Sequence, residues 1–148
     1  MSFFGKVFGG GGETAITLNK KEAFVGILYA VIAADGHISQ EEVQDFMKTV
    51  TRARLMQDTP GNQFRDMINK LNKLLRKEGP EALVKRAAGS IPNDIRPGVF
   101  AYACDLVFSD GNADESEQKL LDIIKAEFAI EDALAYKVAE VVVIKNKI

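Results

Sequence analysis

The chain has 148 residues, of which 47% are hydrophobic, and this is enough for one compact domain with its own core. Charged residues make up 27% of the chain and the net charge is −2, as is ordinary for a globular protein. The single cysteine, Cys104, excludes an internal disulfide framework and a thiolate metal cluster within one chain. The longest apolar run, residues 23–34, is too short to span a bilayer, and no signal-peptide pattern opens the chain. We therefore expect a cytoplasmic protein.

Residues 1–12 differ from the rest, and we expect a flexible or docking segment followed by one helical domain over residues 13–148. Four apolar side chains lie within residues 3–8, at spacings that one helical turn would gather on one side, and Gly9–Gly12 follows as a hinge. Three interpretations are open: peripheral contact with a membrane or a partner through residues 3–8, a disordered tail, or a segment that folds back onto the core.

From residue 19 onward helix signals follow one another, and no segment alternates with period two for long, so the predicted class is all-α. A capping pair, in which a polar residue precedes Glu by three positions, occurs at Asn19, Ser39 and Asp114. Residues 58–62 have the composition of a loop. We expect about seven helices: residues 19–34, 39–50, 64–78, a short helix from residue 80, 99–108, 114–128 and 131–146. The first of these has almost no polar face, which predicts a central position.

The chain repeats itself with an offset of 75 residues, and this indicates a duplicated helix–loop–helix unit. Both copies contain the pattern D-G-x-φ-[S/D]-x-x-E between two predicted helices, where φ is apolar or small. A single-domain bundle of two repeats related by a pseudo-twofold axis is therefore expected. The matching pairs are Asp35 and Asp110, Gly36 and Gly111, Ser39 and Asp114, Glu42 and Glu117, and Phe46 and Leu121.

The repeated loop matches the last eight positions of a calcium-binding EF-hand loop, but the ligand positions before them do not match. Apolar residues stand where an EF-hand requires oxygen ligands, so neither loop supplies the six to eight oxygens that calcium takes, and an ordinary EF-hand is excluded. These residues are Val31, Ala33, Leu106 and Phe108.

What remains is half of a cation site in each repeat, which would become one shared site if the two loops meet. Its candidate ligands for a divalent metal ion (calcium, zinc or manganese) are Asp35, Glu42, Asp110, Asp114 and Glu117. The alternative is that these residues only cap helices and form turns, for which their positions already give a reason.

No catalytic constellation emerges from the sequence, and we expect neither an enzyme nor an organic cofactor. The lone His37 stands in a predicted turn, and Cys104 stands among apolar residues, where a buried and inert thiol is expected. Asp105 lies on the same apolar helix, and we expect it to pair with Lys or Arg or to face the surface.

The Met-Ser-Phe-Phe start, the helical pattern and the two acidic loops together resemble the TerB tellurite-resistance family over residues 19–147. The resemblance implies an all-helical bundle with clustered acidic residues and a role in the response to metal or oxyanion stress. It also implies association with a membrane-bound complex. The family's acidic motif residues correspond to Asp35, Glu42, Asp110 and Glu117, while His37 and Ala113 depart from the pattern.

Charge is segregated along the chain: residues 48–86 carry ten Lys/Arg against four Asp/Glu, and residues 87–132 carry three against ten. This pattern predicts charged partners or self-association, although solvated helix faces explain it as well.

Together these features favour a non-enzymatic, metal-linked interaction module with a protein partner and no nucleic-acid partner. The alternative is a structural adaptor whose loops are only helix caps and whose charged faces bind a partner. Oligomeric state is left open.

Overall fold

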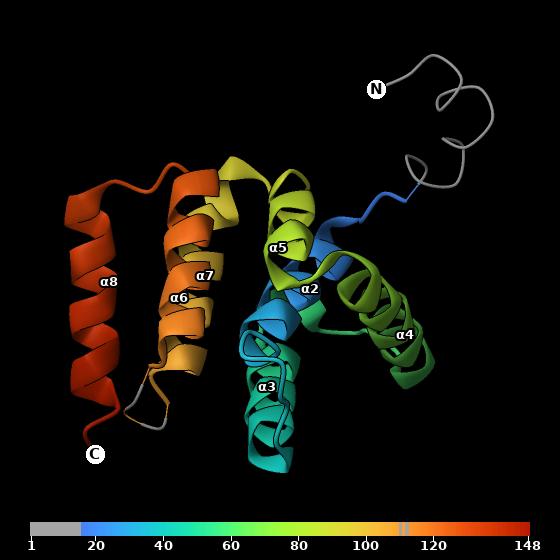
Figure 1. Ribbon diagram of the computed structural model, residues 1–148, viewed down its shortest axis with the longest axis horizontal. Helices are drawn as coiled ribbons and strands as arrows, with labels where there is room; N and C mark the ends of the chain where they lie inside the picture. The colour runs from blue at the N-terminus through green and yellow to red at the C-terminus, as the bar shows by residue number, and fades with distance from the viewer. Residues whose placement is uncertain (1–15, 110, 112) are drawn as a thin grey trace.

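The computed structural model describes residues 16–109, 111 and 113–148, so the predictions for residues 1–12 and for Asp110 as a ligand lie outside the described residues. The described residues form seven α-helices and two 3-10 turns and contain no strand, which confirms the predicted all-α class (Figure 1). The pseudo-twofold relation of the repeats stays a prediction. The elements are α2 (Lys20–Ile32), α3 (Gln40–Arg52), η2 (Arg54–Met56), α4 (Gly61–Glu78), α5 (Pro80–Ala88), η3 (Asn93–Ile95), α6 (Arg96–Val107), α7 (Glu115–Glu127) and α8 (Asp132–Lys145).

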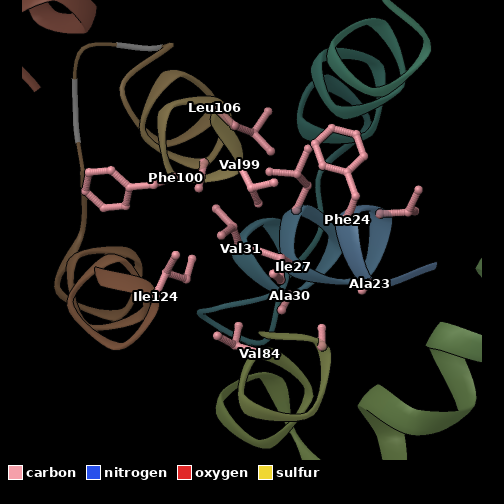
Figure 2. Close-up of a cluster of buried hydrophobic side chains, with 14 of the residues drawn as sticks. Ala23, Phe24, Ile27, Ala30, Val31, Val84, Val99, Phe100, Leu106 and Ile124 are labelled. Atoms are coloured by element: carbon pink, nitrogen blue, oxygen red, sulfur yellow. The ribbon is translucent and has the colours of Figure 1, made fainter. Parts of the chain in front are cut away.

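Helix α2 is the centre of the molecule, as its nearly continuous apolar sequence predicts. It packs against α3, α4, α5, α6 and α7, and every residue from Ala23 to Leu28 is buried. Figure 2 shows its side chains meeting Val84 of α5 and Val99 of α6. Because α2 is covered on all sides, it needs no polar face.

Gly26 lies where both α4 and α5 pack against α2. A Cβ atom built on Gly26 would lie 2.9 Å from Cδ2 of Leu71 and 3.8 Å from Cδ1 of Leu83. The absence of a side chain at this position therefore lets three helices pack together.

The outer helices bury one stripe each. Helix α3 buries only Phe46 and Val50, and α4 buries Met67, Leu71 and Leu74.

The predicted loop over residues 58–62 is wrong at its last two residues, because α4 begins at Gly61. The first N–H groups of a helix need no partner within the helix, so loop-forming residues are tolerated there.

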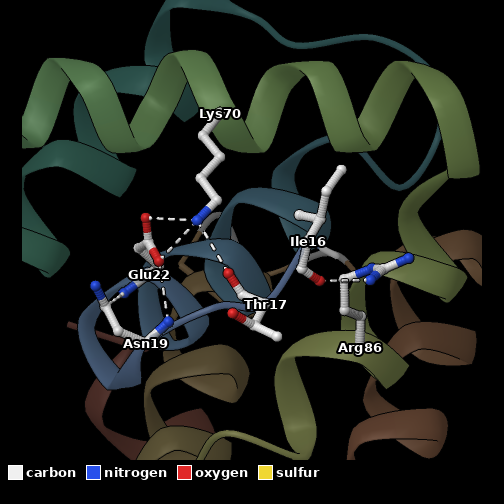
Figure 3. Close-up of polar contacts among 6 residues, drawn as sticks. All are labelled: Ile16, Thr17, Asn19, Glu22, Lys70 and Arg86. Carbon is white, nitrogen blue, oxygen red and sulfur yellow. Dashed lines mark hydrogen bonds and ion pairs between the residues drawn. The ribbon is translucent and has the colours of Figure 1, made fainter. Parts of the chain in front are cut away.

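The segment that enters α2 is fastened to α4 and α5 (Figure 3). Lys70 Nζ donates to the carbonyl oxygen of Thr17 at 3.0 Å and forms an ion pair with Glu22 at 3.1 Å. Arg86 Nη1 donates to the carbonyl oxygen of Ile16 at 2.8 Å. These bonds fix the direction in which the chain arrives at the central helix.

Candidate functional site

The first acidic loop joins α2 to α3 by a tight reversal. Gly36 has φ +86°, in the left-handed region that favours glycine, and its N–H donates to the carbonyl of Ala33 at 3.1 Å. The His37 N–H donates to Asp35 Oδ1 at 2.9 Å, so the Asp35 side chain holds the turn in shape.

Two reciprocal capping boxes, at the starts of α3 and α7, confirm the predicted helix starts. The Glu42 N–H donates to Ser39 Oγ at 3.1 Å, and the Ser39 N–H donates to Glu42 Oε1 at 3.1 Å. The Glu117 N–H donates to Asp114 Oδ1 at 2.8 Å, and the Asp114 N–H donates to Glu117 Oε1 at 3.2 Å. In each cap the glutamate carboxylate accepts from the N–H of the capping residue.

The second loop repeats the backbone geometry of the first at the residues that are described. Gly111 has φ +82°, and its N–H donates to the carbonyl of Phe108 at 3.1 Å. Ser109 Oγ donates to the carbonyl of Leu106 at 3.0 Å. Asp110 and Asn112 lie outside the described residues.

The two loops meet on one cleft of about 210 Å³, at the end of the bundle where α2 and α6 finish and α3 and α7 begin. Helix α3 packs against α6, which brings the two repeats together here. The described lining contains six carboxylates and no Lys, Arg or His. The lining residues are Ile32, Asp35, Ser39, Glu41, Glu42, Asp45, Leu106, Val107, Ser109, Asp114 and Glu117.

Four of the five sequence-predicted ligands therefore face one cleft, and the fifth is Asp110. Two further acids, Glu41 and Asp45, were missed from the sequence. The spacing held a signal for them, since Asp45 follows Glu41 by four residues and Glu42 by three and therefore shares their side of α3.

The cleft is not a preformed metal centre among the described residues. No three His, Cys, Asp or Glu side chains among them are arranged to hold an ion. The predicted ligand set thus stays a prediction. The capping bonds already give a reason, without a metal, for the acidic residues at positions 42, 114 and 117.

The groups considered for catalysis lie elsewhere. His37 is exposed and does not line the cleft. Cys104 is 2% exposed, and its burial, with the charge of Asp105 beside it, raises the pKa of the thiol to about 12. Asp105 accepts hydrogen bonds from Lys145 Nζ at 2.7 Å and from Asn146 Nδ2 at 3.1 Å, which confirms the predicted pairing.

A family model described as "Tellurite resistance protein TerB" matches residues 21–139, a range that contains both acidic loops. The chain belongs to the TerB family. Membership associates this TerB domain with tellurite resistance, and its all-helical architecture agrees with the family's helical domain. No curated protein and no solved structure shows a significant match to it. In the part of the TerB domain that is described, no helix has both the length and the apolarity that crossing a membrane requires.

Proposed function

We propose that this TerB domain is a non-enzymatic interaction module of a tellurite or metal stress response, and that its acidic cleft takes up a divalent cation. The observation that carries the proposal is the convergence of carboxylates from both repeats on one cleft whose described lining has no basic side chain. Crowded carboxylates repel one another, and a bound cation would remove that repulsion.

The donor set fits a hard cation better than a soft one. Calcium takes six to eight oxygens at about 2.3–2.6 Å, supplied by carboxylates, carbonyls and water. Asp35 and Glu42 from the first loop and Asp114 and Glu117 from the second line the same cleft and would contribute together. Because no three of the described acids are arranged for an ion, uptake requires the carboxylates to draw together. Cation binding would therefore tighten the junction between the repeats.

Thermal unfolding and titration calorimetry with calcium, zinc and manganese test the proposal. A cation at a hundredfold excess over its Kd stabilises the folded state by about 2.7 kcal/mol. For a chain of this size that corresponds to a rise in Tm of roughly 5–11 °C. No heat and no change in Tm at millimolar metal would overturn the cation proposal.

The decisive variant removes acids that the capping boxes do not use. Asp35→Asn/Glu41→Gln/Asp45→Asn should abolish the metal-dependent rise in Tm while leaving both caps intact. Asp94→Asn/Glu115→Gln/Asp122→Asn is the matched control, because it also neutralises two Asp and one Glu, all of them exposed and none of them lining the cleft. Equal losses in both variants would indicate a general charge effect instead of a site.

A second candidate, a structural adaptor whose loops are only caps, is favoured by the capping bonds of Glu42 and Glu117 and by the turn bond of Asp35. The two candidates differ in one outcome. An adaptor keeps the same Tm with and without divalent metal.

In either case we propose that the partner is a protein, in a membrane-associated complex, and that the domain itself catalyses no reaction. Reduction of tellurite by the purified protein with a supplied thiol or nicotinamide reductant should not exceed the reaction without protein. Turnover above that background would contradict the non-enzymatic assignment.

A further inference from the structure

Helix α8 has more exposed large apolar side chains than any other described helix. It forms one edge of the molecule (Figure 1), packs against α6, and has Val142 as its one buried residue. Five of its large apolar side chains are exposed: Leu134, Tyr136, Val141, Val143 and Ile144. A helix that is apolar on all sides is normally covered on more than one of them, so α8 has the composition of a helix with a second contact.

One exposed stripe has the spacing of a helix–helix seam. Leu134, Lys137, Val141 and Ile144 follow one another at intervals of three, four and three residues, the alternation found in coiled coils. Leu134 is 39% exposed, Val141 63% and Ile144 56%. We call these four residues the α8 seam. The side of α8 that packs on the core is a different one, formed by Ala135, Val138 and Val142.

The charges of α8 divide into two groups. Asp132 pairs with Lys125 of α7 at 2.7 Å, and Lys145 pairs with Asp105 of α6 at 2.7 Å, so these two fasten α8 to its own chain. Lys137, in the seam, and Glu140, beside it, form no ion pair within the described part of the chain. The one charged seam residue and the adjacent acid are thus available to a partner.

The seam is complementary to itself when two copies run antiparallel. If a twofold axis passes beside residue 139, Leu134 faces Ile144 of the second copy, and Val141 faces the aliphatic stem of Lys137 of the second copy. The same register brings the Lys137 ammonium beside Glu140 of the second copy, twice by symmetry. One register therefore satisfies both the apolar contacts and the charges, which a parallel arrangement would not, because it sets Lys137 against Lys137.

We propose that the α8 seam is an interaction surface for a second copy of this chain, which binds through an antiparallel, twofold-symmetric α8–α8 contact. A helix of 14 residues is about 21 Å long, so the contact is smaller than a standard protein–protein interface. The dimer is accordingly weak and reversible, with a Kd in the micromolar range.

Sedimentation equilibrium in EDTA tests the proposal independently of cation uptake in the cleft. The apparent mass should rise from one chain toward two across concentrations that bracket the expected Kd. Val141→Glu should raise the Kd at least tenfold, since it buries a carboxylate in the apolar seam. Val143→Glu makes the same change two residues away, off the seam, and should leave the Kd unchanged. Circular dichroism melts establish that both variants are folded.

A charge exchange tests the register itself. Lys137→Glu and Glu140→Lys should each associate more weakly than the wild type, because like charges then face each other. An equimolar mixture of the two variants should recover association, since each chain supplies the charge that the other lacks.

Three results would overturn the proposal. The first is a mass of one chain at every concentration. The second is an equal effect of Val141→Glu and Val143→Glu, and the third is a mixture that associates no better than its components. If the wild type is monomeric and only Val141→Glu loses binding to anionic phospholipid vesicles, the seam's occupant is a bilayer and the second-copy assignment is wrong.

Discussion

Replacing the helical glycines Gly26 and Gly98 in turn by alanine makes the same chemical change in opposite environments. Alanine is favoured over glycine by about 1 kcal/mol in the interior of a helix, and by less in the first turn. At Gly98, in the first turn of α6, an added Cβ meets no atom within 4 Å. We therefore expect Gly98→Ala to raise the free energy of unfolding by roughly 0.5 kcal/mol.

At Gly26 the added Cβ lies 2.9 Å from Cδ2 of Leu71, a side chain with no exposed surface. Overpacking a filled core costs about 1–3 kcal/mol, which equals or exceeds the gain in helix propensity. Gly26→Ala should therefore be less stable than Gly98→Ala by roughly 0.5–2.5 kcal/mol, or about 1–10 °C in Tm.

Urea unfolding of the two single variants measures this difference in stability. Repeating the Gly26→Ala change in a Leu71→Ala background identifies its cause. Leu71→Ala alone should cost about 2–5 kcal/mol. When Gly26→Ala is added to Leu71→Ala, the clash is absent and about 1 kcal/mol should be recovered. The reasoning is refuted if Gly26→Ala stabilises the wild type as much as Gly98→Ala does, or if its effect is the same in both backgrounds.

Two further predictions concern the caps and the cysteine. Ser39→Ala and Asp114→Ala should each lower the free energy of unfolding by about 1 kcal/mol in urea titrations, since each leaves a helix N–H without its side-chain acceptor; unchanged stability would show that water replaces the cap without loss. The thiol of Cys104, with its pKa raised to about 12, should be about 10⁻⁴ ionised at pH 8 and react with a thiol reagent only as the chain opens. Labelling of the folded protein as fast as of the unfolded chain would contradict this.

Features that depend on residues close together in the sequence could be predicted from it. The capping boxes of Asn19, Ser39 and Asp114 are interactions over three residues, so composition and spacing identify them. The central place of α2 follows from its uninterrupted apolar sequence, because such a helix is stable only when it is covered.

Features that depend on how helices approach one another could not be predicted. Nothing in the sequence around Gly26 indicates that Leu71 lies against it, since this contact depends on the α2–α4 crossing. The sequence of α8 is apolar on several sides and does not indicate which side packs on α6. Asp45 could not be assigned to the cleft from the loop pattern, because it lies outside the repeated loop, one turn into α3.

The burial of α2 by five helices from along the chain has a consequence for how the protein folds. Its side chains meet Val84, Val99 and Ile124, so its core is complete only when most of the chain is present. A polypeptide cut between α4 and α5 would leave α2 without three of its five neighbouring helices. We therefore expect the fragment that ends after α4 not to fold by itself, and the described helices to unfold in one cooperative transition. A change at the acidic cleft, where the two loops meet, should then alter the free energy of unfolding of all the described helices together.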